Sequence, residues 1–80
     1  MDKNEVKEKL KEIVEDFLYI EDVQEENKLI EDLGADSLDC VELVMCIENE
    51  FDIVISAKET NKVKTIRDAE KLICNKLNIK

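Results

Sequence analysis

The chain has 80 residues and a net charge of −9; 44% of its residues are hydrophobic, but it has only two Phe, one Tyr and no Trp. This length suits one domain, residues 1–80, with a small aliphatic core, and one glycine without proline favours an all-α fold over a β-sandwich. The acidity argues against nucleic-acid binding, and no stretch is apolar enough for a signal peptide or membrane insertion. We expect a soluble cytoplasmic protein, with an organellar protein whose transit peptide was trimmed as the alternative.

The first helix is predicted over residues 3–18, because apolar residues recur there at helical spacing. Its apolar arc comprises Val6, Leu10, Ile13, Val14, Phe17 and Leu18. Residues 19–35 lack a sustained period, and a loop of this length usually has a function or local structure. We expect its apolar side chains to pin it to the core, namely Leu29, Ile30 and Leu33. A calcium loop is excluded, since Leu29 and Cys40 would replace the first and last carboxylates.

The segment LGADSLD at residues 33–39 contains the only glycine and leads into the longest apolar-periodic stretch. Gly34 allows a sharp turn, Asp36 is predicted as the N-cap of a helix, and Asp39 completes a capping box. Ser37 then lies in the first turn with its hydroxyl outward, where unpaired N–H groups favour an anion such as a phosphate ester, although both aspartates partly oppose it. The alternative is a first-turn serine without chemistry.

The second helix, residues 37–51, carries two apolar stripes where a surface helix needs one. The stripe assigned to the core comprises Cys40, Leu43, Val44, Ile47 and Phe51. We call the opposite stripe, Leu38, Val41 and Met45, the docking strip. Acids border it, namely Asp39, Glu42 and Glu48, as expected of an exposed surface that binds partners. The alternative is a central helix buried on both sides.

Two further capping boxes predict the last two helices. Ser56 with Glu59 starts a short third helix that ends near residue 62, and Thr65 starts a fourth that runs to about residue 78. The inward face of the fourth helix is predicted to comprise Ile66, Ala69, Ile73 and Leu77. Ile55 is expected to pack beside the end of the second helix. The expected fold is a small four-helix bundle with a long loop between helices one and two and a short third helix.

Charge is unevenly distributed along the chain. Residues 1–28 have a net charge of −5, from ten acids and five lysines. Residues 29–57 have a net charge of −8 and no basic residue, and residues 58–80 have a net charge of +4. The anionic middle third would steer partners that have Lys/Arg patches, and the alternative is a solvated face that maintains solubility. The three cysteines, Cys40, Cys46 and Cys74, have no zinc-like spacing and no histidine partner, so we expect no metal site and three small core residues in a reducing compartment.

The stretch GADSL and the helix pattern DSLDCVELVMCIENEF resemble the attachment site and recognition helix of acyl carrier proteins. The resemblance implies that Ser37 carries a 4′-phosphopantetheine arm, transferred from coenzyme A by a phosphopantetheinyl transferase with magnesium, and that the arm holds acyl chains as thioesters. It also implies partner binding by Asp36, Leu38, Asp39, Val41, Glu42, Met45 and Glu48, with Ile55 beside them. The third helix is less acidic than the family pattern, with Lys58, Thr60 and Asn61 where acids are common.

Three classes of function remain. A carrier in fatty-acid biosynthesis, expected as a monomer, explains all these features; polyketide, peptidyl and D-alanyl carriers are alternatives. A small acidic adaptor or phosphoprotein explains the charge but not the GADSL match. An enzyme is poorly supported, because the chain has no histidine for a Ser-His or Cys-His pair, and Glu31 and Asp32 are better interpreted as loop acids. We therefore expect no catalytic residue.

Overall fold

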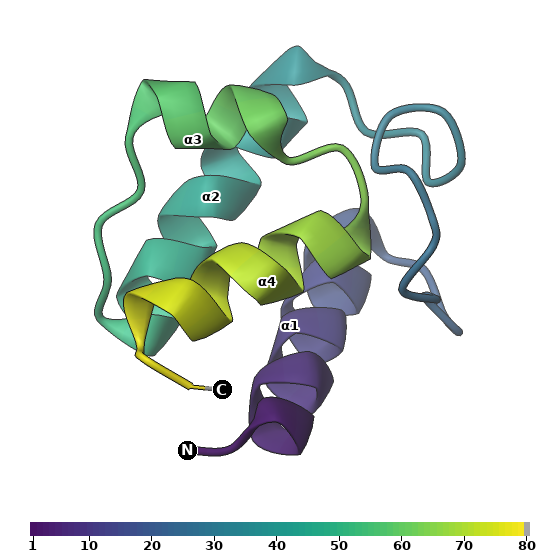
Figure 1. Ribbon diagram of the computed structural model, residues 1–80. Helices are drawn as coiled ribbons and strands as arrows, with labels where there is room; N and C mark the ends of the chain where they lie inside the picture. Colours follow the sequence, from purple (N-terminus) through teal and green to yellow (C-terminus); the bar gives the residue numbers. More distant parts are fainter. Residues whose placement is uncertain (80) are drawn as a thin grey trace.

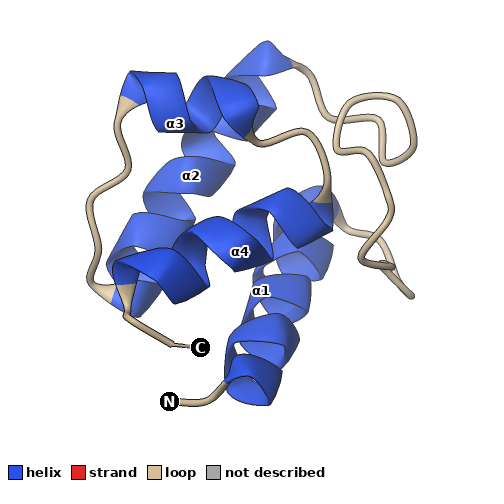
Figure 2. Cartoon of the chain, viewed as in Figure 1, coloured by secondary structure: helices blue, strands red, loops and turns tan. Residues whose placement is uncertain are grey.

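The computed structural model describes residues 1–79 and shows helices joined by loops (Figure 1). Their bounds are α1 (Lys3–Leu18), α2 (Ser37–Phe51), α3 (Ala57–Lys62) and α4 (Ile66–Lys76). Figure 2 shows no strand in this part of the chain, and an isolated antiparallel bridge joins Lys28 to Thr65. The predicted all-α fold is confirmed, including the short third helix and the long loop between α1 and α2. None of the helices in residues 1–79 combines the length and the apolarity that crossing a membrane requires.

Each helix starts at a residue whose side chain accepts a hydrogen bond from one free N–H group of the first turn. Asp2, Asp36, Ser56 and Thr65 are the N-caps, and the last three form capping boxes. The end of α4 differs from the prediction, because the helix stops at residue 76 instead of about 78. Asn78 has φ +58°, a left-handed conformation that ends a helix and that asparagine tolerates.

The core lies where α1 packs against α2 and α4. Its helical members are Val6, Leu10 and Val14 from α1, Leu43, Ile47 and Phe51 from α2, and Ile66, Ala69, Ile73 and Cys74 from α4. The predicted residues Ile13, Phe17, Leu18, Cys40 and Leu77 are only partly buried and pack around this core. α3 has no buried residue, so local opening of this helix would disrupt less core packing than opening of the other helices.

The loop between α1 and α2 also contributes to the core. Leu29 is buried and Leu33 is half-buried, as predicted, and Val23 and Ala35 are buried although no periodic pattern marks them. Ile30 is 52% exposed, so the prediction that it pins the loop was wrong. The chain turns sharply after residue 29, which leaves the next side chain on the outer side of the turn.

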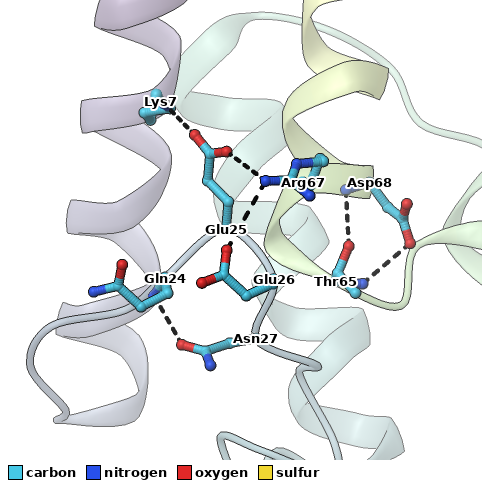
Figure 3. Close-up of polar contacts among 8 residues, drawn as sticks. All are labelled: Lys7, Gln24, Glu25, Glu26, Asn27, Thr65, Arg67 and Asp68. Atoms are coloured by element: carbon cyan, nitrogen blue, oxygen red, sulfur yellow. Dashed lines mark hydrogen bonds and ion pairs between the residues drawn. The ribbon is translucent and has the colours of Figure 1, made fainter.

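Glu25 ties the middle of this loop to two helices (Figure 3). Its carboxylate forms ion pairs with Lys7 of α1 and with Arg67 of α4, the latter at 3.1 Å. The Arg67 backbone N–H donates to the Glu25 carbonyl at 2.8 Å, and the N–H of buried Val23 donates to the Glu15 carboxylate at 3.1 Å. The loop therefore follows a fixed path without regular secondary structure.

The two ends of the described chain lie together, at the end of the bundle away from the start of α2 (Figure 1). Lys3 and Ile79 line one surface groove with Lys71 and Asn75 of α4. The residue that opens α2 and the chain ends therefore occupy opposite ends of the molecule.

Candidate functional site

The entry to α2 has the predicted geometry. Gly34 adopts φ +77°, a conformation that side chains rarely take, and it turns the chain toward the helix. A Cβ at this position would meet no atom within 4 Å, so the backbone angle and not space requires glycine. An Asp36 carboxylate oxygen accepts from the Asp39 N–H at 2.8 Å, and an Asp39 carboxylate oxygen accepts from the Asp36 N–H at 3.2 Å. The capping box is thus complete without Ser37.

Ser37 is the first residue of α2, and its side chain is exposed. A groove of about 570 Å³ opens beside it, between the loop, the first turns of α2 and the α3 region. The walls of the groove comprise Lys28, Leu29, Ile30, Glu31, Cys40, Val41, Thr60, Asn61, Val63 and Lys64. Sequence reasoning missed Val63 and Lys64, because only the path of the chain after α3 brings them to the start of α2.

A second, much smaller cavity of about 20 Å³ lies beneath this groove in the core. Its lining includes the buried side chains of Leu10, Leu43 and Ile47. It shares four lining residues with the groove, so the two spaces adjoin; we call these four residues the partition, namely Leu29, Cys40, Thr60 and Val63. The groove beside Ser37 therefore adjoins the apolar interior.

The docking strip is exposed, as predicted. The exposed fractions of its side chains are 64% for Leu38, 51% for Val41 and 57% for Met45. The alternative of a helix buried on both sides is excluded, because these three side chains are exposed whereas Leu43 and Ile47 on the other side are buried. The strip leaves apolar area in water that the fold does not use, which is typical of surfaces that bind a partner.

The two acids beside the strip differ in their surroundings. Glu42 is exposed, whereas Glu48 is half-buried and its carboxylate accepts a hydrogen bond from the Ile55 N–H at 2.8 Å. Ile55 is half-buried against the core and bonds to Glu48 in the last turn of α2, which confirms its predicted packing, and it lines a groove with Val41 and Met45. Glu48 therefore fixes the connection between α2 and α3 as well as contributing charge.

The three cysteines do not share the predicted core environment. Cys74 is buried, Cys40 is half-buried in the partition, and Cys46 is exposed, so the prediction was wrong for Cys46. Cys46 precedes buried Ile47, and the step of about 100° per residue carries its side chain out of the buried arc of α2. Residues 1–79 contain no cluster of three or more side chains able to hold a metal ion.

The pKa of the Cys40 thiol is raised by its surroundings in the first turn of α2. Burial raises its pKa, the negative charges of Asp39 and Asp36 raise it further, and the positive charge of Lys64 partly opposes them. The negative charges of Asp36 and Asp39 and the positive charge of Lys64 therefore all act on the Cys40 thiol, which lies one helical turn after Ser37.

The capping box of α3 holds a strongly perturbed carboxyl group. The Ser56 N–H donates to Glu59 at 3.0 Å, and the Lys76 ammonium lies 2.9 Å from the same carboxylate. The backbone hydrogen bond, followed by the one from Lys76, lowers the pKa of Glu59 to about 2. This pair links α3 to the end of α4.

A small helical bundle that presents a serine at a helix start, beside a groove that adjoins the core, has the architecture of a carrier domain. Residues 8–73 match the family described as phosphopantetheine attachment site. The chain is 48% identical over 66 residues to an acyl carrier protein of Wolinella succinogenes. The aligned residues cover 80% of this chain and 87% of that protein. The chain therefore belongs to the phosphopantetheine-binding family of acyl carrier proteins.

The fold is similar to a solved structure titled as a candidate acyl carrier protein of Mycobacterium tuberculosis. The TM-score is 0.84 with 28% sequence identity, over 88% of this chain and 96% of that one. The family defines a carrier with a phosphopantetheine attachment site, served by a transferase and by acyl-processing enzymes, and not a catalyst. The function of the site is therefore to carry a group and not to catalyse a reaction.

Proposed function

We propose that Ser37 is the attachment residue and that the chain carries acyl groups for fatty-acid biosynthesis. The position of Ser37 carries this proposal: it is exposed at the first residue of α2, outside the capping box and beside the groove. The arm, once attached, supplies a thiol that holds acyl groups as thioesters. The protein supplies position, because docking makes each encounter between cargo and active site effectively intramolecular.

The groove and the cavity beneath it support a sheltering role. The inner cavity of about 20 Å³ has room for about one water molecule, so an acyl chain can enter only if the walls move. α3 is the wall best suited to move, since it buries no residue. The partition that a chain would cross is mostly apolar, which favours hydrocarbon over water.

The docking strip supports binding to enzymes that present basic patches around an apolar centre. Its three exposed side chains would be buried in the complex, and the surrounding acids would orient the partner during approach. The proposed contact residues are Asp36, Leu38, Asp39, Val41, Glu42, Met45, Glu48 and Ile55. We further propose that residues 1–80 form a single carrier domain that acts as a monomer in the cytoplasm.

The decisive experiment for Ser37 is modification of the apo protein with coenzyme A, magnesium and a phosphopantetheinyl transferase. The protein should gain the mass of one phosphopantetheine, located on Ser37 by peptide mapping, and Ser37→Ala should gain none. Ser56 is the only other serine, so Ser56→Ala is the matched control and should be modified as the natural chain is. Modification at another residue, or addition of phosphate alone, would favour the adaptor hypothesis.

The pathway requires a second assay on the modified protein. Malonyl transfer to the arm, followed by elongation with purified fatty-acid-synthesis enzymes, should give acyl-protein species that grow by two carbons. Loading by a peptidyl, D-alanyl or polyketide system instead, with no fatty-acid elongation, would reassign the pathway and leave the attachment to Ser37 intact.

A further inference from the structure

An arm on Ser37 would place its phosphodiester in an unfavourable field. A phosphodiester is an anion at neutral pH, and Asp36 and Asp39 stand on either side of the attachment residue. Residues 29–57 contain no base, so this part of the chain offers no counter-ion. The N–H groups at the start of α2 are partly used by the capping box. A cation from elsewhere in the chain would offset this repulsion.

Two lysines from outside that segment line the same groove as Ser37, namely Lys28 and Lys64. Their backbones are held side by side, since the Leu29 N–H donates to the Lys64 carbonyl at 3.0 Å. The Lys64 N–H in turn donates to the Asp68 carboxylate at 3.1 Å. Both side chains therefore start from fixed points on the groove wall.

Lys64 is the better placed of the two. Its positive charge acts on the thiol of Cys40, which lies one helical turn after Ser37, and opposes the rise in the pKa of that thiol. Within residues 1–79 its ammonium lies in no ion pair, whereas the Lys28 ammonium lies 3.2 Å from the Glu31 carboxylate. Lys64 thus has a charge that the fold itself leaves unused.

We propose that the Lys64 ammonium pairs with the phosphodiester of the arm on Ser37 and directs the arm along the groove toward α3, with Lys28 as a second cation. The inference rests on the proposed function, because it requires the arm to be on Ser37. The ammonium donates hydrogen bonds to the phosphate oxygens, and the pair offsets the repulsion by Asp36 and Asp39. Lys64 is thereby a positioning residue: it sets where the thioester end begins its path over the partition.

The test uses the full chain in its modified form, with mass spectrometry first to establish that Ser37 carries the arm. The ³¹P line width then reports how strongly the phosphodiester is immobilised, and the Val63 amide shift between apo and modified protein reports whether the arm lies in the groove. Lys64→Gln should narrow the ³¹P line and reduce the Val63 shift. The loss should correspond to a roughly two- to fivefold lower population of the paired state, as for an exposed ion pair.

Three comparisons separate a specific pair from general charge effects. Lys64→Arg should keep the broad line, Lys58→Gln should change nothing because Lys58 lies on α3 outside the groove, and about 0.5 M salt should reproduce the effect of Lys64→Gln. An unchanged line in the Lys28→Gln/Lys64→Gln double variant, or an equal effect of Lys58→Gln, would overturn the inference. A failure to gain mass at Ser37 would instead overturn the proposed function, and the inference with it.

Discussion

The two sides of α2 present similar residues to different surroundings. One side places Leu43, Ile47 and Phe51 in the core, where α2 packs against α1 and each of the three is at most 5% exposed. The other side leaves Leu38 and Met45 more than half exposed, with acids around them. Hydrophobicity alone therefore does not decide burial, because the neighbouring elements do. The comparison assigns stability to one side and recognition to the other, and this separation can be tested.

The largest effect is expected on the buried side. Leu43→Ala or Ile47→Ala should lower the free energy of unfolding by roughly 2 to 5 kcal/mol, because each leaves a cavity in a filled core. Domains of this kind are often only about 5 to 15 kcal/mol stable, so either variant could be largely unfolded when warm. Urea unfolding followed by circular dichroism measures the change. A loss below about 1 kcal/mol would show that this side is not the core.

The acids beside the docking strip should differ from each other. Glu48→Ala should cost about 1 to 3 kcal/mol, because the half-buried Ile55 N–H loses its acceptor. Glu42→Ala is the matched control, since Glu42 is exposed, and it should change stability by about 0.5 kcal/mol or less. The same urea unfolding compares them. Equal effects would mean that Glu48 serves only as a surface charge.

The docking strip should tolerate truncation in the free protein. Leu38→Ala and Met45→Ala should change the free energy of unfolding by about 0.5 kcal/mol or less, yet slow modification by the transferase or acyl transfer through lost partner contacts. Unfolding and transferase rates would be measured on the same preparations. If both variants destabilise the fold as much as Leu43→Ala, the strip belongs to the core and the docking surface lies elsewhere.

Charge should affect the rate of association more than the stability. Glu42→Lys should slow association with a fatty-acid-synthesis enzyme, and raising the ionic strength should slow association of the natural chain, since the Debye length is about 10 Å at 0.1 M. Stopped-flow association at two or more salt concentrations measures both. Glu8→Lys on α1 changes the net charge by the same amount as Glu42→Lys at an exposed position outside the docking strip, so it is the control for net charge. A rate indifferent to salt and to Glu42→Lys would remove the steering argument.

The smallest effect concerns pH and the wall formed by α3. The pKa of Glu59 is lowered from 4.5 to about 2, so any stabilisation from its charged form is complete above pH 4.5 and is lost as pH falls through about 2. NMR titration of the Glu59 carboxyl should give this low pKa, and Lys76→Gln should move it upward. A pKa near 4.5 in the natural chain would show that the capping box of α3 does not hold the carboxylate.

The sequence predicted the features that depend on near neighbours. Helix bounds followed from the apolar period and from the caps at Asp36, Ser56 and Thr65, all of which act within a few residues. Cys46 was assigned wrongly because the small size and apolar character of cysteine were given more weight than its position relative to Ile47. The prediction of the candidate site was correct for the exposure of Ser37 and of the docking strip.

Features that depend on distant parts of the chain could not be predicted from periodicity. Glu25 meets Lys7 and Arg67 only because the loop crosses between α1 and α4 (Figure 3). Burial of Val23 follows from the same path, and the path of the chain after α3 brings Lys64 to the groove at the start of α2. A loop without a repeating pattern carries no local signal of which side chain points inward.

The ends of the described chain lie near each other at the end of the bundle opposite the start of α2, which has a practical consequence for handling the protein. A purification tag, a fluorophore or a linker to a sensor surface can be joined at residue 1, the described end opposite the start of α2, without standing in front of Ser37. The same placement suits circular permutation, since a short linker joining the ends would cross only the groove between Lys3 and Ile79. New ends cut into the exposed stretch around Glu21 would leave the start of α2 undisturbed.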